Sequence, residues 1–177
     1  VESPAPEELA AWRSLPFNEE EYRQREVGSP ELTGEAGFSV LERTWARPTL
    51  EVHGIVGGFV SKGFKTVIPA KAHAKISCRL VPSQDPEITL NQLKAAIAAA
   101  TPKGVTSRFE LFGASPASVV NPQHPILHAA SEALAQTFQK PTVYMRSGGS
   151  IPVVGLFQRE LGIPSVLMGF GLPDDNL

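Results

Sequence analysis

Residues 146 to 150, Arg-Ser-Gly-Gly-Ser, combine several groups that bind anions. Arg146 brings a fixed positive charge, and Ser150 brings a hydroxyl group. Gly148 and Gly149 leave backbone N–H groups accessible between an expected strand and an expected helix. Such a turn suits a carboxylate, or an oxygen that gains negative charge during a reaction. A plain strand-to-helix turn without a ligand is the alternative interpretation.

A second arginine, Arg79, lies near the end of the segment 70–80. Small or apolar residues alternate there with Lys, His, Ser and Arg, as in a strand with one buried and one exposed face. Pro82 ends the pattern, so the guanidinium of Arg79 would be held at the strand end, where its planar fork can bind a carboxylate. Otherwise Arg79 is a solvated charge.

Other residue types that support catalysis are few. Cys78, the one cysteine, falls on the apolar side of the segment 70–80. We therefore expect a buried thiol in a reducing, cytoplasmic compartment. His124 and His128 are four residues apart on an expected helix, but two imidazoles make only half a metal site, so we interpret them as surface histidines.

The elements that must position these residues follow from hydrophobic periodicity. We expect strands over 50–53, 70–80 and 105–111, and a helix over 86–100 that precedes the third strand. This order predicts an α/β fold class: an α+β sandwich in which helices cover one face of an antiparallel sheet.

The two ends of the chain differ from this central part. Residues 1–47 are charged and rich in proline, and we expect two short helices there, over 3–12 and 18–26, before a glycine-containing loop. The part after residue 116 alternates helix, strand, helix and strand, which is typical of a parallel α/β layer. Its expected helices cover 124–138 and 151–161, and its expected strands cover 142–145 and 165–170.

Composition excludes some classes of partner. The 177 residues carry a formal net charge of −2 and no basic stripe, so we expect no nucleic-acid partner. No apolar run approaches the roughly 20 residues that cross a bilayer, so we expect no membrane partner. The chain starts with Val rather than Met, and we expect a fragment or a processed chain.

Four segments together resemble a known family. They are KTVIPAKAHAKISCRLVP, HGIVGGF, RSGGSIPV and GFGLPDDN. In order and spacing they are similar to the di-metal amidohydrolases and exopeptidases, which include aminoacylases, carnosinase-type dipeptidases and carboxypeptidase G. The resemblance covers roughly residues 45–177.

This resemblance implies a zinc-dependent exopeptidase or dipeptidase that hydrolyses small peptides or N-acyl amino acids. In that family a catalytic domain with two zinc ions carries an inserted dimerisation, or lid, domain with a four-stranded sheet and two helices. Residues 1–115 would be the lid domain without its first strand, and residues 116–177 the C-terminal segment of the catalytic domain. The zinc ligands would lie outside this chain, so we expect it to be inactive alone and to form a homodimer through the lid.

The resemblance also assigns roles to individual residues. Thr66 and Arg79 match lid positions that contact the carboxylate end of the substrate, from the neighbouring subunit in the dimeric members. The substrate-binding loop of the catalytic domain is matched by Arg146, Gly148, Gly149 and Ser150. One position departs from the family: Phe112 stands where many members have a histidine, and an apolar ring cannot donate a hydrogen bond to substrate.

An interpretation from another class remains open. An α/β domain whose sheet edge pairs with a second copy would be a stand-alone dimerisation or interaction module without catalysis.

Overall fold

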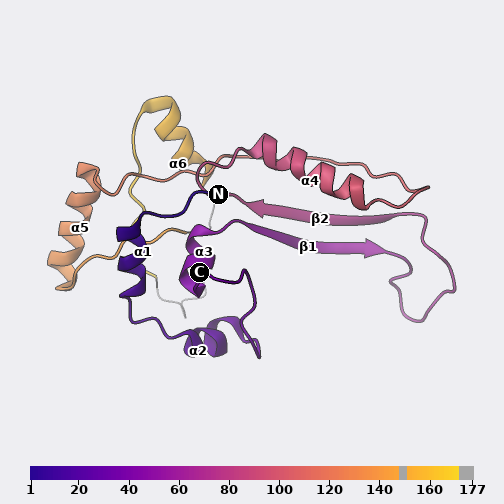
Figure 1. The fold of residues 1–177 in the computed structure, drawn as a ribbon, viewed down its shortest axis with the longest axis horizontal. Coiled ribbons are helices and arrows are strands. Elements are labelled where there is room, and N and C mark those ends of the chain that lie inside the picture. Colours follow the sequence, from indigo (N-terminus) through magenta and orange to yellow (C-terminus); the bar gives the residue numbers. More distant parts are fainter. Residues whose placement is uncertain (148–150, 172–177) are drawn as a thin grey trace.

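The computed structural model describes residues 1–147 and 151–171. A long two-stranded hairpin extends to one side, helices α1, α3 and α5 gather on the other, and α4 runs beside the hairpin (Figure 1). Helices and an antiparallel sheet together confirm the predicted mixed fold class. Within the described part of the chain, no helix is long and apolar enough to cross a membrane.

The first two predicted helices are present. Helix α1 spans Pro6–Arg13, with proline at its start. Helix α2 spans Glu19–Glu21 and continues as a wider π-type turn over Tyr22–Val27, so the predicted helix start at Asn18 is confirmed. Gly28 ends this turn with a φ of 66°, a left-handed conformation that favours glycine.

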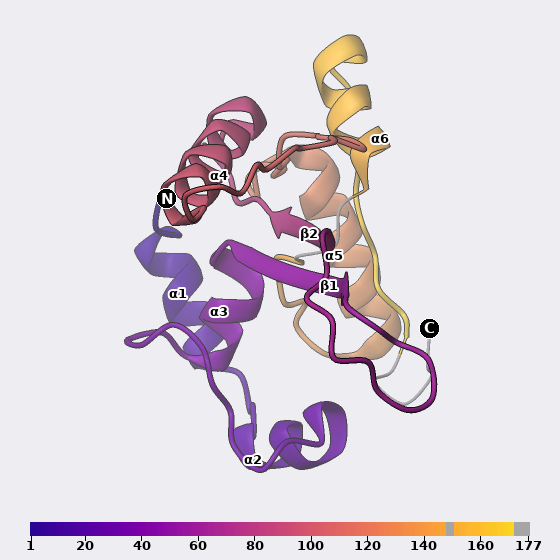
Figure 2. The same ribbon diagram turned by 90° about the vertical axis from the view of Figure 1, so that its right-hand side faces the viewer.

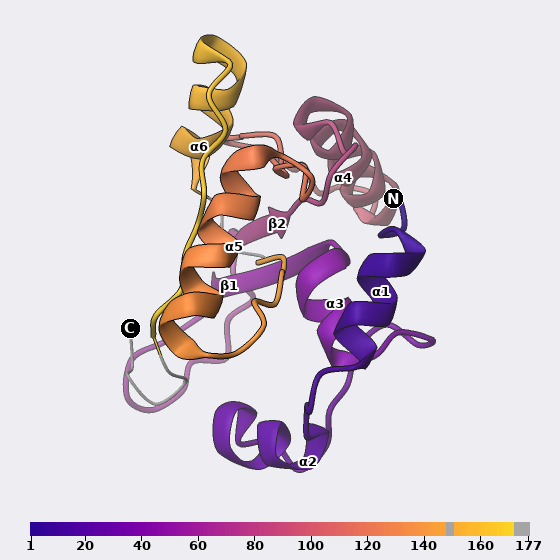
Figure 3. The same cartoon turned by 90° about the vertical axis from the view of Figure 1, so that its left-hand side faces the viewer.

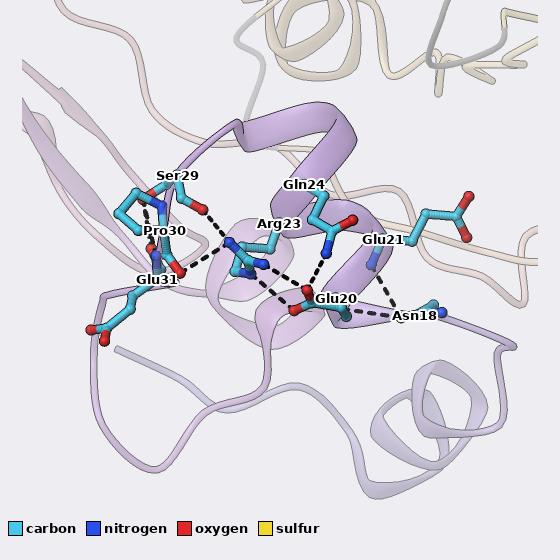
Figure 4. A network of polar contacts seen from close by, with 8 residues as sticks. All are labelled: Asn18, Glu20, Glu21, Arg23, Gln24, Ser29, Pro30 and Glu31. Atoms are coloured by element: carbon cyan, nitrogen blue, oxygen red, sulfur yellow. Dashed lines mark hydrogen bonds and ion pairs between the residues drawn. The ribbon is translucent and has the colours of Figure 1, made fainter.

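An arginine-centred network holds this wide turn against the loop that follows (Figure 4). Arg23 donates to both carboxylate oxygens of Glu20, at 2.6 and 2.9 Å. The same guanidinium donates to the carbonyls of Ser29 at 2.6 Å and Pro30 at 2.9 Å. The hydrogen bonds from Arg23 and then Gln24 lower the pKa of Glu20. Glu20, near the start of this helix, therefore has a structural role.

Helix α3, Val40–Ala46, was not predicted, because the glycines before it indicated a loop. It begins with a capping box: the hydroxyl of Ser39 accepts from the backbone N–H of Glu42 at 3.3 Å, and the Glu42 carboxylate accepts from the backbone N–H of Ser39 at 2.7 Å. Both groups would otherwise lack a partner at the helix end.

The small core lies between α1 and α3. Trp12 is 2 % exposed, and Val40 and Ala46 are buried with it. The rings of Trp12 and Trp45 meet edge to face, with centroids 5.3 Å apart and an angle of 83°. The segment that follows α5 runs toward this pair of helices (Figure 3), and the indole N–H of Trp12 donates to its Tyr144 carbonyl at 3.2 Å.

Acid should destabilise this core through Glu42. The backbone N–H of Ser39 and then the guanidinium of Arg13, at 2.8 Å, hold the pKa of Glu42 below its ordinary value, against the opposing effect of burial. A carboxyl group with a lowered folded-state pKa stabilises the fold above its unfolded pKa of roughly 4.3, and this contribution is lost as the pH falls through the folded-state value.

We therefore expect Glu42→Gln to make the free energy of unfolding depend less steeply on pH below about 5. Urea unfolding followed at a series of pH values measures this slope. Glu2→Gln, at an exposed position, is the control. Equal slopes for wild type and Glu42→Gln would contradict the role of Glu42.

Strands β1, Thr49–Gly57, and β2, Ala72–Arg79, form the hairpin. The strand predicted at 70–80 is confirmed, and β1 is longer than predicted. The register runs from Thr49 opposite Arg79 to Gly57 opposite Ala72, with a bulge between Val52 and Gly54.

The prediction that one face of β2 is buried is wrong. Residues 72–76 are exposed on both faces, and burial begins only at Ser77 and Cys78, which are half-buried. The alternating pattern predicts which face of the strand could be buried. Among the described residues, however, no helix or strand covers that face at residues 72–76. Burial raises the pKa of the Cys78 thiol, and Glu51 adds to the rise.

Helices α4, Pro86–Ala100, and α5, Pro125–Phe138, confirm two predictions. The carboxylate of Asp85 caps α4 by accepting from two backbone N–H groups at 2.8 and 2.9 Å. Figure 2 looks at the molecule from the loop end of the hairpin and shows α4 beside the two strands. His124 caps α5 by accepting at Nδ1 from the N–H of Ile126 at 3.2 Å, a structural role that fits the interpretation of this histidine.

The predicted helix over 151–161 is also present, but three predicted strands are wrong. Helix α6, Pro152–Leu156, continues as a π-type turn over Phe157–Leu161. Within residues 1–147 and 151–171, the segments 105–111, 142–145 and 165–170 form no strand. A strand exists only when a neighbour accepts and donates its backbone hydrogen bonds, and apolar β-branched residues do not supply that neighbour.

Candidate functional site

Arg146, predicted to bind the carboxylate of a ligand, binds a carboxylate of this chain in the structure. Its Nε donates to Oε1 of Glu8 and its Nη2 donates to Oε2 of Glu8, each at 2.7 Å. The two side chains are 21 % and 22 % exposed. This paired geometry is the one in which guanidinium and carboxylate bind most strongly.

Trp12 completes the surroundings of Arg146. The guanidinium carbon lies 6.0 Å from the centre of the Trp12 ring, at the outer limit of a cation–π contact. The same indole donates to the carbonyl of Tyr144, two residues earlier. Helix α1 thus holds both the backbone before Arg146 and the Arg146 side chain.

Gly148, Gly149 and Ser150, the rest of the predicted anion-binding turn, lie outside the described residues. Their part in the turn stays a prediction.

The hairpin keeps Arg79 and Thr66 apart within one chain. Arg79 is the last residue of β2 and lies opposite Thr49. Thr66 is exposed in the segment 58–71, which closes the opposite end of the hairpin (Figure 1). Strand β2 has eight residues, so its ends are separated by roughly 23 Å at ~3.3 Å per residue. Arg79 and Thr66 therefore lie toward opposite ends of the hairpin, and their part in substrate binding stays a prediction.

A polar cluster on the hairpin was not predicted. The Nε2 of His53 and the hydroxyl of Ser77 lie 2.6 Å apart, and that hydroxyl donates to Glu51 at 3.2 Å. The hydroxyl of Thr49 also donates to Glu51. Here the carboxylate contacts the hydroxyl rather than the histidine, so the arrangement is not that of a nucleophilic triad. Cross-strand register brings these residues together, and that register could not be read from local sequence.

Of the predicted site residues, those that the structure describes, Thr66, Arg79 and Arg146, do not line the groove beside α3. A groove of about 440 Å³ lies between α3 and the wide turn that follows α2, lined mostly by apolar residues such as Phe17, Trp45 and Met145, with Glu26 as an acidic member. Among the described residues, no group of three or more His, Cys, Asp or Glu side chains could hold a metal ion. We therefore assign no chemical step to a metal ion held by these residues.

Sequence reasoning missed Glu8 as a partner of Arg146. An acidic residue in the first turn of a helix is common because it interacts favourably with the helix dipole, so Glu8 carried no distinctive local signal. Only the packing of residue 146 against residue 8 reveals the pair.

Comparison with known proteins identifies relatives of this chain. A family model described as the peptidase dimerisation domain matches residues 7–105, more than half of the chain. The Cys-Gly metallodipeptidase DUG1 of Saccharomyces cerevisiae is 32 % identical over 173 residues, which are 96 % of this chain and 36 % of that protein. The Beta-Ala-His dipeptidase of Homo sapiens is 29 % identical over 178 residues, 96 % of this chain and 34 % of its own length.

Solved structures that resemble this chain are also peptidases. Human carnosine dipeptidase 1 has a TM-score of 0.79 and 27 % identity, and the match covers 98 % of this chain and 37 % of that one. An M20 family metallo-carboxypeptidase from Sulfolobus solfataricus has a TM-score of 0.78 and 27 % identity, over 92 % of this chain and 36 % of that one. The chain spans about a third of the length of these relatives. With its dimerisation-domain match and these relatives, the chain belongs to the M20 family of metallopeptidases.

Proposed function

We propose that this chain is the dimerisation and substrate-binding part of a longer zinc-dependent dipeptidase that hydrolyses small peptides or N-acyl amino acids. The observation that carries the proposal is the match of nearly the whole chain to two dipeptidases, one by sequence and one by structure. The relatives are named for hydrolysis of Cys-Gly and Beta-Ala-His. Both are dipeptides that end in a free carboxylate, a group that arginine binds well.

In this proposal residues 1–115 are the dimerisation domain and residues 116–177 return to the catalytic domain. The end of the family match at residue 105 supports this division. The contacts of Arg146 with Glu8 and of Tyr144 with Trp12 would then hold the two parts together.

A homodimer would bring the dimerisation domain of one copy to the substrate of the other, so that Thr66 and Arg79 contact that substrate from the neighbouring copy. The exposed edge of the hairpin could form such a dimer by lying beside the hairpin of a second copy. Several apolar side chains of β1 support this pairing: Leu50 is 55 % exposed, Val52 51 % and Ile55 76 %.

The chain's own residues would bind and orient the substrate. Arg79, Thr66 and Arg146, with the turn at Gly148, Gly149 and Ser150, would bind its carboxylate. Such fixed donors can also stabilise an oxygen that gains charge when the amide carbonyl is attacked. A bound zinc ion would supply the nucleophile by lowering the pKa of a water molecule. The ligands of the zinc ion would come from other parts of the longer protein.

A cytoplasmic location is also part of the proposal. Its support is that Cys78, the one cysteine of this chain, is a free thiol, as is usual in a reducing compartment.

The proposal is tested by assaying the full-length protein with Cys-Gly and Beta-Ala-His. We expect hydrolysis of at least one, loss of activity after treatment with a chelator, and recovery with added zinc. Light scattering should give a dimer. A dimer that hydrolyses neither peptide, with or without zinc, would favour the stand-alone dimerisation module.

A further inference from the structure

We propose that Glu8 is a positioning residue: it holds Arg146 by one edge of the guanidinium so that the other edge can bind the carboxylate of a peptide ligand. This inference rests on the proposed function, since it concerns the same ligand. It adds a residue of α1, far from the glycine turn in sequence, to the binding machinery. Residues 8 and 146 are 138 positions apart.

Among the residues that the structure describes, the contact with Glu8 occupies only one edge of the Arg146 guanidinium. A guanidinium has two edges that can donate two parallel hydrogen bonds, the Nε–Nη2 edge and the Nη1–Nη2 edge. Glu8 occupies the Nε–Nη2 edge, with both distances at 2.7 Å. A second carboxylate can then approach the Nη1–Nη2 edge in the same plane.

Burial makes the contact with Glu8 a fixed one. The side chains of Glu8 and Arg146 are each about one-fifth exposed, whereas Arg25, in a surface ion pair with Glu21, is 79 % exposed. Surface ion pairs of the latter kind contribute little and exchange readily with water. Trp12 limits the movement of Arg146 further, because its ring lies beside the guanidinium and its N–H fixes the backbone at Tyr144.

The carboxylates of Glu8 and of the ligand would both lie beside Arg146, so the net effect of Glu8 on ligand binding depends on two opposing contributions. Glu8 partly neutralises the charge that would attract a ligand, so its removal could strengthen binding by charge alone. Removal also frees a long side chain, and ordering such a side chain again on binding costs about 0.5–1.5 kcal/mol, or roughly 2- to 10-fold in affinity. We infer that orientation dominates, because the guanidinium keeps its fixed charge while its planar fork binds only in one orientation.

The test uses full-length protein and two non-hydrolysable probes. Both are Cys-Gly analogues in which a CH₂–NH group replaces the peptide bond, one with a free carboxylate and one with a carboxamide. Calorimetry gives the dissociation constant of each for wild type, Glu8→Ala, Arg146→Ala and the double variant. Glu7→Ala, at the exposed neighbouring position on α1, is the matched control.

We expect Glu8→Ala to weaken binding of the acid about 3- to 10-fold, to leave binding of the amide unchanged, and to have no further effect in the Arg146→Ala background. Equal weakening of acid and amide would indicate a purely structural role and overturn the inference. Tighter binding of the acid would overturn it too, by showing that charge neutralisation dominates.

The same experiment separates this inference from the proposed function. If the protein hydrolyses no peptide but still binds the acid analogue in a Glu8-dependent way, the dipeptidase proposal fails and the positioning role stands. If the protein is an active dipeptidase whose binding of the acid is insensitive to Glu8→Ala, only the positioning role fails. If wild type binds neither probe, the positioning role also fails, because no carboxylate is then bound by Arg146.

Discussion

Replacing Trp12 by alanine should lower the free energy of unfolding by about 3–5 kcal/mol, the usual cost of removing a buried aromatic ring. Trp12 is 2 % exposed and is the largest fully buried side chain among the described residues. Its loss would leave a cavity between α1 and α3, and would remove the edge-to-face contact with Trp45 and the hydrogen bond to Tyr144.

Urea unfolding followed by far-UV circular dichroism measures this effect without depending on tryptophan fluorescence. Trp12→Phe is the matched control, because it keeps an aromatic ring and loses the N–H donor, and we expect it to cost distinctly less. A loss below about 1 kcal/mol for Trp12→Ala would show that α1 and α3 do not depend on this ring.

Replacing Arg79 by alanine in the full-length protein should reduce kcat/KM for dipeptides by about 30-fold, which corresponds to about 2 kcal/mol of transition-state stabilisation. The reason is the loss of a charge-assisted contact to the substrate carboxylate at the end of β2. The measurement is steady-state kinetics with Cys-Gly, accompanied by thermal unfolding to confirm that the variant is folded.

Two further variants isolate the cause. Arg79→Lys keeps the positive charge and loses the planar fork, so we expect it to recover only part of the activity. Lys75→Ala removes a different exposed cation from the same strand and should leave kcat/KM unchanged. An Arg79→Ala variant with wild-type kcat/KM would remove Arg79 from the proposed substrate contacts.

Features that depend on a few neighbouring residues were predictable. Helix α4 follows from a capping aspartate, a proline and a repeating apolar stripe, and α5 from the same kind of signal at His124. The strand ending in Arg79 follows from strict alternation. Helix α3 shows the limit of this approach. Its capping box at Ser39 and Glu42 could be read from the sequence, but the spaced glycines that precede it indicated a loop.

The candidate site was only partly predictable, because some of its contacts join residues that are distant in the sequence. The sequence indicated that Arg79 and Arg146 are suited to bind carboxylates, since a guanidinium keeps its positive charge and its planar fork wherever it lies. It did not indicate that Glu8 binds Arg146 or that Ser77 lies between His53 and Glu51.

The sequence by itself therefore determined where the longer helices begin, where the hairpin strands lie, and which side chains can bind an anion, because capping, periodicity and side-chain chemistry act over a few residues. Only the tertiary structure decided which predicted strands exist and which carboxylate Arg146 holds. Strand pairing and the Glu8 contact join residues that are distant in the chain, and no local pattern records which distant partner the folded backbone brings within hydrogen-bonding distance.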